Sequence, residues 1–334
     1  MSLAHRMELD KLIRFSGQPD IFPFYHVVSD WHLPHIRHLY RYRRLQEFEN
    51  DLEELLKWFE PVTFKDYLAH VSEKGGAGSR ERRRGDKKRR MVLSFDDGLA
   101  ECHQVIAPIL KKKGVPAAFF LNNHFVDNHG LFYRYKASLI IDDILSDCRS
   151  LEKASDYLVI PKEQVVKAIL MINPRQQAVL DELARKVEVD FVEYLREDPV
   201  YMSSQQVMEV VRWGFEIGGH SPGHADFSSL SPEEMIQQAK ISVEDLQQRF
   251  ALPSRLFSFP FTSQGVPESV IENLLGEGGM DVLLGTAGLK KTRNPAFIQR
   301  IPMEELEEPA MDVLKSEYLY YLLKKPFGKN NLRY

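Results

Sequence analysis

The sequence predicts an α/β fold built on a largely parallel sheet. Short apolar runs alternate with amphipathic stretches along the chain, as expected for repeated βα units. Several of these runs are almost wholly apolar, which is typical of strands that are buried on both faces. The seven expected strands are Ile21–Val27, Met91–Phe95, Pro116–Leu121, Phe215–Gly219, Leu256–Pro260, Asp281–Gly285 and Phe297–Pro302.

Helices are expected between the strands. In the stretch Arg44–Phe59, apolar residues recur on one face at helical spacing. The sequence Ser231–Glu234 resembles a capping box with proline at the first helical position, which predicts a helix that continues to about Phe250. Lys113–Pro116 is expected to end another helix and to lead into the strand that follows.

Two segments depart from this alternation. Residues 75–90 combine glycines with a run of Arg and Lys, which indicates a basic, flexible loop. Residues from about 127 to 203 hold helical patterns and need no strand, so they predict a helical insertion. With these two segments included, we expect residues 1–334 to form a single domain.

The composition narrows the class of protein. A hydrophobic content of 43% is ample for a large core, and a net charge of −4 gives no indication of a nucleic-acid partner. No apolar run reaches the roughly 18 residues that span a bilayer, so no transmembrane segment is expected. The two cysteines are too few for a disulfide framework, and the charged N-terminus does not resemble a signal peptide. A cytoplasmic location is therefore expected.

The sequence MVLSFDDG contains the first chemical motif. A buried strand leads directly to Asp96 and Asp97, and the carboxyl ends of parallel strands are where active sites gather. Two adjacent carboxylates at the edge of a core repel each other, and a cation removes that cost. The alternative is that Asp96 caps the next helix and Asp97 is solvated.

FEIGGHSPGH is the second motif. Another strand ends here, and His220 and His224 follow at a spacing that lets both imidazoles reach one ion. Two surface histidines in a Ser-Pro-Gly turn are the alternative. Two His and one Asp with open positions make a typical hydrolytic metal site.

These motifs resemble a known family. SFDDG, then HSPGHADFSSLS, then FSFPFTSQG are similar to successive motifs of the polysaccharide deacetylase family, also called the NodB-homology family or family 4 carbohydrate esterases. The similarity extends from about Tyr25 to Met303, apart from the two segments described above. It implies a distorted (β/α) barrel of about seven parallel strands that carries the helical insertion, in agreement with the seven predicted strands.

The resemblance also implies roles for individual residues. Asp96 would be the general base that activates water, and Asp97, His220 and His224 would hold one divalent metal ion. The backbone N–H of Phe261 would help to bind the oxyanion. Zinc is the expected metal, although Co, Ni, Fe or Mn also suits such ligands.

Two positions depart from the usual family motifs. Ser258 stands where the family has an arginine that is thought to orient the base. The Leu-His-Asp motif, whose histidine protonates the leaving amine, is missing, and Arg300 lies at or near its expected position; arginine stays protonated and cannot be a general acid. His26, in FYHVVSD, is similar to the Tyr-His-x-Val opening of the subgroup that trims poly-N-acetylglucosamine, whose third motif reads FAYPYG. Either His26 or a metal-bound water protonates the leaving group; the alternative for His26 is a hydrogen-bonded histidine under the rim of the barrel.

The resulting prediction is a metal-dependent enzyme that releases acetate from an N-acetylated amino sugar in a poly- or oligosaccharide, or in its lipid-linked precursor. One alternative is an amide hydrolase that acts on a small cyclic amide or ureide. Another is a catalytically silent relative that binds glycan, because two motif residues are missing. Trp31, Tyr40 or Tyr42 could border the sugar. The sequence does not predict the oligomeric state.

Overall fold

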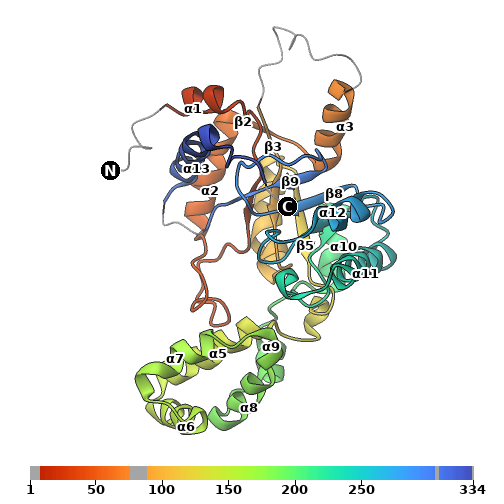
Figure 1. Ribbon diagram of the computed structural model, residues 1–334. Coiled ribbons are helices and arrows are strands. Elements are labelled where there is room, and N and C mark those ends of the chain that lie inside the picture. Colours follow the sequence, from red (N-terminus) through yellow and green to blue (C-terminus); the bar gives the residue numbers. More distant parts are fainter. Residues whose placement is uncertain (1–7, 76–88, 305–307, 333–334) are drawn as a thin grey trace.

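The computed structural model describes residues 8–75, 89–304 and 308–332. Its centre is a nearly closed barrel of parallel strands with helices around it (Figure 1). The barrel strands follow one another in the order β10-β1-β4-β5-β6-β7-β8-β9, and a separate pair is formed by β2 and β3. The predicted α/β fold with a distorted barrel is therefore confirmed.

The strands are β1 Pro23–Tyr25, β2 Phe59–Pro61, β3 Arg89–Met91, β4 Leu93–Phe95, β5 Ala117–Leu121, β6 Glu216–Gly219, β7 Leu256–Ser258, β8 Val282–Gly285, β9 Phe297–Gln299 and β10 Ile301–Pro302. The α-helices are α1 Leu9–Ser16, α2 Leu45–Trp58, α3 Phe64–Gly75, α4 Ala107–Lys113, α5 Tyr133–Ser146, α6 Cys148–Leu158, α7 Lys162–Leu170, α8 Ala178–Val187, α9 Phe191–Glu197, α10 Ser204–Arg212, α11 Pro232–Phe250, α12 Glu268–Leu275 and α13 Ala310–Lys324.

The last predicted strand closes the barrel. Residues 297–302 form two strands, of which β9 pairs with β8 and β10 pairs with β1. Arg300 lies between them, and its backbone N–H donates a hydrogen bond to the carbonyl of Gly285, while that of Ile301 donates to Phe22. The single strand predicted over these residues is thus two strands, one paired with β8 and the other with β1. This is why seven predicted strands correspond to an eight-stranded barrel.

The three predicted helices form where the sequence places them. Helix α2 buries Phe48, Leu52 and Leu55 on its inner face. Helix α11 begins with the predicted capping box at Ser231. Helix α4 ends at Gly114, whose φ of 66° is left-handed. The sequence analysis missed the small β2–β3 pair, whose residues 59–61 and 89–91 lie beside the barrel and pair outside it.

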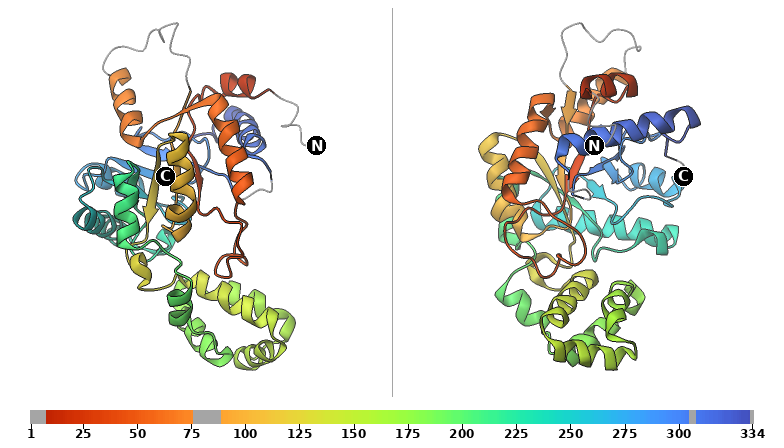
Figure 2. Two further views of the ribbon diagram at one scale, coloured as in Figure 1. Left: turned by 180° about the vertical axis from the view of Figure 1, so that it is seen from behind. Right: turned by 90° about the vertical axis from the view of Figure 1, so that its left-hand side faces the viewer.

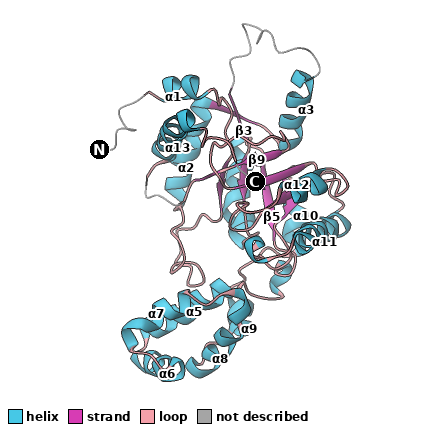
Figure 3. Ribbon diagram, viewed as in Figure 1, coloured by secondary structure: helices cyan, strands magenta, loops and turns pink. Residues whose placement is uncertain are grey.

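Helices α5 to α9 form a group at one end of the barrel (Figures 1 and 2). Figure 3 shows only helices and loops in this group. It has an apolar core of its own, which includes Ile140, Ile144, Val165, Leu180 and Leu183. A second apolar cluster, which includes Leu99, Phe132 and Tyr135, joins the group to the barrel. The predicted basic loop at 75–90 lies almost entirely outside the described residues. Within the described parts, no helix has the length and apolarity that crossing a bilayer requires.

Candidate metal centre and its pocket

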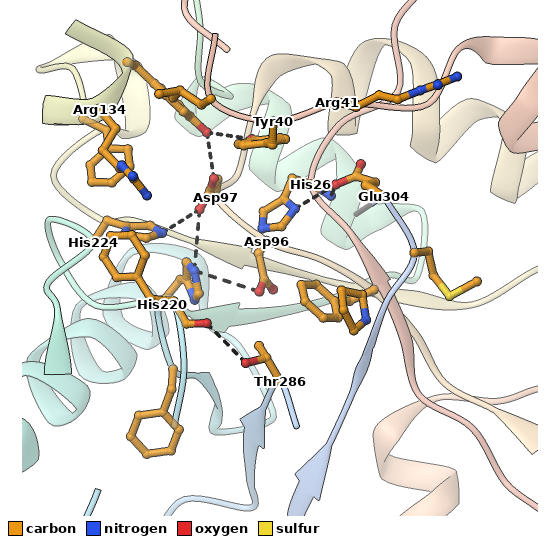
Figure 4. Close-up of a pocket in the computed structure, with 18 residues that line it drawn as sticks. His26, Tyr40, Arg41, Asp96, Asp97, Arg134, His220, His224, Thr286 and Glu304 are labelled. Carbon is orange, nitrogen blue, oxygen red and sulfur yellow. Dashed lines mark hydrogen bonds and ion pairs between the residues drawn. The ribbon is translucent and has the colours of Figure 1, made fainter. Parts of the chain in front are cut away.

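A pocket of about 230 Å³ opens at the carboxyl ends of the barrel strands (Figure 4). Six of its polar residues follow strands directly or within two positions: His26 after β1, Asp96 and Asp97 after β4, His220 after β6, Thr286 after β8 and Glu304 after β10. Because the strands are parallel, their carboxyl ends meet at one end of the barrel, and these side chains converge there. The sequence motifs are thus brought together in one pocket.

Asp97, His220 and His224 meet at the base of this pocket. The Nε2 atoms of His224 and His220 lie 3.2 Å and 3.5 Å from Oδ1 of Asp97. All three side chains are buried. Among the described residues, only this group places three potential metal ligands within 4.8 Å of one another. The three residues that sequence analysis assigned to the metal are therefore those that the structure groups.

The orientation of His220 favours a cation here. Its Nδ1 lies 2.8 Å from the carbonyl oxygen of Ser258, which can only accept, so Nδ1 carries the ring proton. Burial lowers the pKa of His220 to about 4, so near neutral pH the Nε2 atom presents a lone pair to Asp97. Oδ1 of Asp97 has no hydrogen-bond donor among the described residues. Two facing lone pairs repel each other unless a cation lies between them.

The spacing of the three ligand atoms also suits a metal ion. A tetrahedral ion with bonds of about 2.0–2.1 Å keeps its ligand atoms about 3.4 Å apart. The two measured separations, 3.2 Å and 3.5 Å, bracket that value. Asp97, His220 and His224 therefore fit a divalent ion with room for further ligands.

The backbone turns at the site place these ligands. Asp97 has a φ of 72° and His224 a φ of 57°, both in the left-handed region that is uncommon for residues other than glycine. Gly98 follows with a φ of 67°, and a Cβ there would lie 2.7 Å from the side chain of Leu121. Glycine is therefore required after the two aspartates, and the strained turns lie where the chemistry is expected.

Tyr135 of helix α5 supports the metal ligands from outside the barrel. Its hydroxyl donates a hydrogen bond of 2.7 Å to Oδ2 of Asp97. Because that proton goes to Asp97, the 3.2 Å contact between the hydroxyls of Tyr40 and Tyr135 must use the proton of Tyr40. Tyr40, which the sequence analysis proposed for the sugar groove, thus lies in the pocket.

We expect Tyr135→Phe to weaken the binding of a divalent ion by about 10–100-fold, because partners of metal ligands orient the ligands and tune their basicity. Competition titration with a chelator measures this affinity. Tyr201→Phe is the matched control, since its buried hydroxyl accepts from the backbone N–H of Phe132 in the same cluster. Equal losses in both variants would contradict the assignment.

Asp96 lies beside the metal ligands and forms an ion pair with Arg300. Two guanidinium nitrogens lie 2.8 Å and 2.7 Å from the two carboxylate oxygens. Both side chains are buried, and the hydroxyl of Ser258 bridges them, at 2.6 Å from Arg300 and 3.2 Å from Asp96. The arginine thus comes from the junction between β9 and β10, and Ser258, which stands where the family motif has arginine, contacts the same pair.

This pairing keeps Asp96 ionised. Burial by itself would raise its pKa, but the charge of Arg300, with smaller contributions from His220 and His26, holds the pKa below its usual value. A carboxylate offers about four acceptor positions, and the contacts to Arg300 and Ser258 use three of them. One position on Oδ1 is left for a water molecule.

His26 is held by Glu304 on the other side of Asp96 (Figure 4). Its Nδ1 lies 2.8 Å from Oε2 of Glu304. The same carboxylate accepts from the backbone N–H groups of His26 and Val27, at 3.0 Å and 3.1 Å. Burial by itself would lower the pKa of His26, but the hydrogen bond and charge of Glu304, followed by the charges of Asp97 and Asp96, raise it to about 9. Both alternatives for His26 remain compatible with this place: it is hydrogen-bonded and it lines the pocket.

Phe261 lies at the metal side of the pocket. Its φ is 56°, and its ring packs edge-on against His224 with 4.5 Å between centroids. Among the described residues, no group accepts a hydrogen bond from its backbone N–H. A donor that no protein group uses, beside the metal ligands, is what an oxyanion requires.

Sequence reasoning missed Glu304, Tyr135 and the pairing of Arg300 with Asp96. Glu304 follows β10 by two positions, so the rule that identified Asp96 could have found it. Tyr135 could not be found by this rule, because it lies in helix α5 and does not follow a strand. At Gly218 and Gly219, a Cβ would lie 2.5 Å from the ring of Phe120 and from the hydroxyl of Ser242, so glycine lets the neighbouring groups approach the end of β6 closely.

The comparisons with known proteins agree with this geometry. A family model described as polysaccharide deacetylase matches residues 83–275, more than half of the chain. A comparison with curated protein sequences gives no significant match.

Three solved structures have a similar fold. The Streptococcus pyogenes deacetylase PplD, solved in complex with acetate, is 12% identical with a TM-score of 0.54, over 87% of this chain and 94% of that one. IcaB from Ammonifex degensii is 15% identical with a TM-score of 0.52, over 89% and 96%. A de-N-acetylase from Aggregatibacter actinomycetemcomitans is 15% identical with a TM-score of 0.52, over 88% and 98%. At these identities the likeness shows the fold.

Proposed function

The chain belongs to the polysaccharide deacetylase family, and from this premise we propose that it hydrolyses N-acetyl groups of an amino sugar. The sugar is part of a poly- or oligosaccharide or of its lipid-linked precursor, and the products are acetate and a free amino sugar. The observation that carries this proposal is the buried group of Asp97, His220 and His224 beside the ionised Asp96. One divalent ion is required, with zinc as the first candidate.

The residues around the pocket divide the reaction between them. Lewis-acid activation of the acetamide carbonyl and of a water molecule is what a divalent ion supplies when bound by Asp97, His220 and His224. Asp96 accepts the proton of the attacking water at the free position on Oδ1. The backbone N–H of Phe261 donates to the oxygen that becomes negative as the carbonyl carbon turns tetrahedral.

The leaving amine needs a proton, and we assign this step to His26. Its pKa of about 9 means that it is protonated near neutral pH. Glu304 accepts from Nδ1, so Nε2 is the nitrogen left to donate. His26 gives this proton to the amine nitrogen as the C–N bond breaks, which fills the role of the missing Leu-His-Asp histidine.

We expect the pH profile of kcat/KM to fall on the alkaline side as His26 loses its proton. The protonated form is fully present below the ordinary pKa of about 6.5 and is lost as the pH rises through the raised value of about 9. A bound divalent ion would neutralise part of the charge of Asp97, and that charge is one cause of the raised pKa of His26. In the metal-loaded enzyme, kcat/KM should therefore fall at a pH between these two pKa values. Glu304→Gln should move the midpoint of this alkaline fall in kcat/KM towards pH 6.5, because the carboxylate that raises the pKa of His26 is lost.

Glu209→Gln is the matched control for this variant. It removes the carboxylate from another His–Glu pair, in which Nε2 of His103 lies 2.8 Å from Glu209, outside the pocket. An alkaline limb that does not move in Glu304→Gln contradicts the role of Glu304. Unchanged turnover of folded His26→Ala would rule out His26 as the acid.

One observation favours a second candidate, a catalytically silent relative that binds glycan. Arg300 engages both oxygens of Asp96 and lowers its pKa, which weakens Asp96 as a base. Stoichiometric metal binding and binding of sugar oligomers, together with no acetate release from any substrate, would support this candidate.

Acetate release from N-acetylglucosamine oligomers, compared with hydrolysis of cyclic ureides, tests the proposed function. The enzyme reconstituted with Zn, Co, Ni or Mn should release acetate from the oligomers and leave the ureides intact. Ureide hydrolysis without acetate release would instead assign the protein to small cyclic amides.

A further inference from the structure

The charges that line the pocket are mostly matched in pairs. Asp96 is paired with Arg300, and Glu304 with His26. Asp97 faces the two histidines with which it would share a cation. No carboxylate of the pocket is therefore left to neutralise a further positive charge, because these three are the only acidic side chains among the described residues that line it.

Arg134 brings such a further charge into the pocket. It is the second residue of helix α5, it is half-buried, and it lines the pocket on the side of His224 (Figure 4). Its guanidinium carbon lies 5.8 Å from the ring centroid of Phe261. Within the described parts of the chain, Arg134 forms no ion pair with a carboxylate. At this distance the cation is attracted to the face of the Phe261 ring, which keeps the guanidinium next to the proposed oxyanion donor.

Arg41 differs from Arg134. It lines the opposite side of the pocket, near Glu304, but its Nη2 lies 2.9 Å from the carboxylate of Glu47. That contact already gives Arg41 a counter-charge. Of the two arginines that line the pocket, Arg134 is thus the one whose charge a ligand could neutralise.

Resting on the proposed function, we propose that Arg134 binds an anionic group of the substrate, a phosphate or a carboxylate, next to the sugar whose acetamide is cleaved. The planar guanidinium presents two parallel N–H donors that match either group. At about 230 Å³ the pocket is smaller than most ligand pockets, so the acetamido sugar fills it and the neighbouring group lies at the mouth with Arg134. The substrate class is therefore an acidic or phosphorylated N-acetylamino sugar rather than a neutral polymer.

Binding to the Asp96→Asn protein loaded with zinc tests this inference without turnover. Calorimetry compares N-acetylglucosamine 1-phosphate, an N-acetylglucosamine–glucuronate disaccharide and neutral diacetylchitobiose. We expect at least one anionic probe to bind about tenfold or more tightly than the neutral one, and less so at high salt. The better anionic probe identifies phosphate or carboxylate as the group.

The ratio of the affinity for the anionic probe to that for the neutral probe should fall to about one in Arg134→Met. It should be partly retained in Arg134→Lys. Circular dichroism confirms that each variant is folded. Arg293→Met is the control, since it removes the same charge from a residue that pairs with Glu268 outside the pocket. Equal or tighter binding of the neutral probe, or a preference that survives Arg134→Met, overturns the inference. Acetate release by the wild-type enzyme from the same probes is scored separately: none from any probe contradicts the proposed function, while the binding ratio still decides the role of Arg134.

Discussion

Asp96→Asn should lower acetate release by about 10²–10⁴-fold, the usual contribution of a general base. The amide oxygen of asparagine can still accept from Arg300 but cannot take a proton from water. Asp96 is not among the three grouped metal ligands, so zinc stoichiometry should stay at that of the wild type. Acetate release at saturating substrate, measured together with bound zinc, checks both statements.

Asp97→Asn is the informative comparison for this variant. The neighbouring carboxylate faces both histidines, so its loss should reduce zinc affinity as well as turnover. If Asp96→Asn kept full activity, or if both variants lost zinc to the same degree, the separate roles given to the two aspartates would be wrong.

Arg300→Met should reduce the free energy of unfolding by about 3–5 kcal/mol, because it leaves the charge of Asp96 buried without its partner. The exposed fractions of the Arg300 and Asp96 side chains are 0% and 2%, so water cannot replace the lost interaction. Urea unfolding of the metal-free protein measures the change.

The loss should depend on pH in a defined direction. Arg300 lowers the pKa of Asp96, so their pairing stabilises the fold above the unfolded pKa of about 3.9 and is lost as the pH falls through the lower folded value. In Arg300→Met, burial raises the pKa of Asp96, so the variant is more severely destabilised at pH 8 than at pH 5.

The double variant Arg300→Met/Asp96→Leu provides the control, because it removes both charges together. We expect it to be more stable than Arg300→Met alone, since an apolar pair can replace a buried ion pair at little cost. It should also be inactive. A double variant that is less stable than the single one would contradict the account of this pair.

Much of the fold could be predicted because the barrel strands are short apolar runs bounded by clear turn signals. Residues 117–121, AAFFL, are all buried, as expected for a short apolar strand covered on both faces. The small β2–β3 pair could not be predicted, because the polar residues 89–90 carry no strand signal and pair only through proximity to β2. The division of residues 297–302 between two edges likewise depends on barrel closure, which no local pattern encodes.

The grouping of the metal ligands could be predicted for a different reason. Asp97, His220 and His224 all follow strands, and parallel strands place their carboxyl ends together. Tyr135 and Arg134 could not be found in this way, because a helical group attached between β5 and β6 brings them over the pocket. The pairing of Asp96 with Arg300 could not be predicted either, because the two residues are 204 positions apart in sequence and the motif comparison only put Arg300 at or near the position of the missing histidine.

Metal dependence tests the central claim most directly. The protein is stripped with a chelator and reloaded in steps, and bound zinc and acetate release from N-acetylglucosamine oligomers are measured on the same samples, with His220→Ala beside the wild type. The account predicts that acetate release rises in proportion to zinc up to one ion per chain, and that His220→Ala shows neither. Acetate release that persists in the stripped protein, or one zinc bound as tightly by His220→Ala, would contradict it.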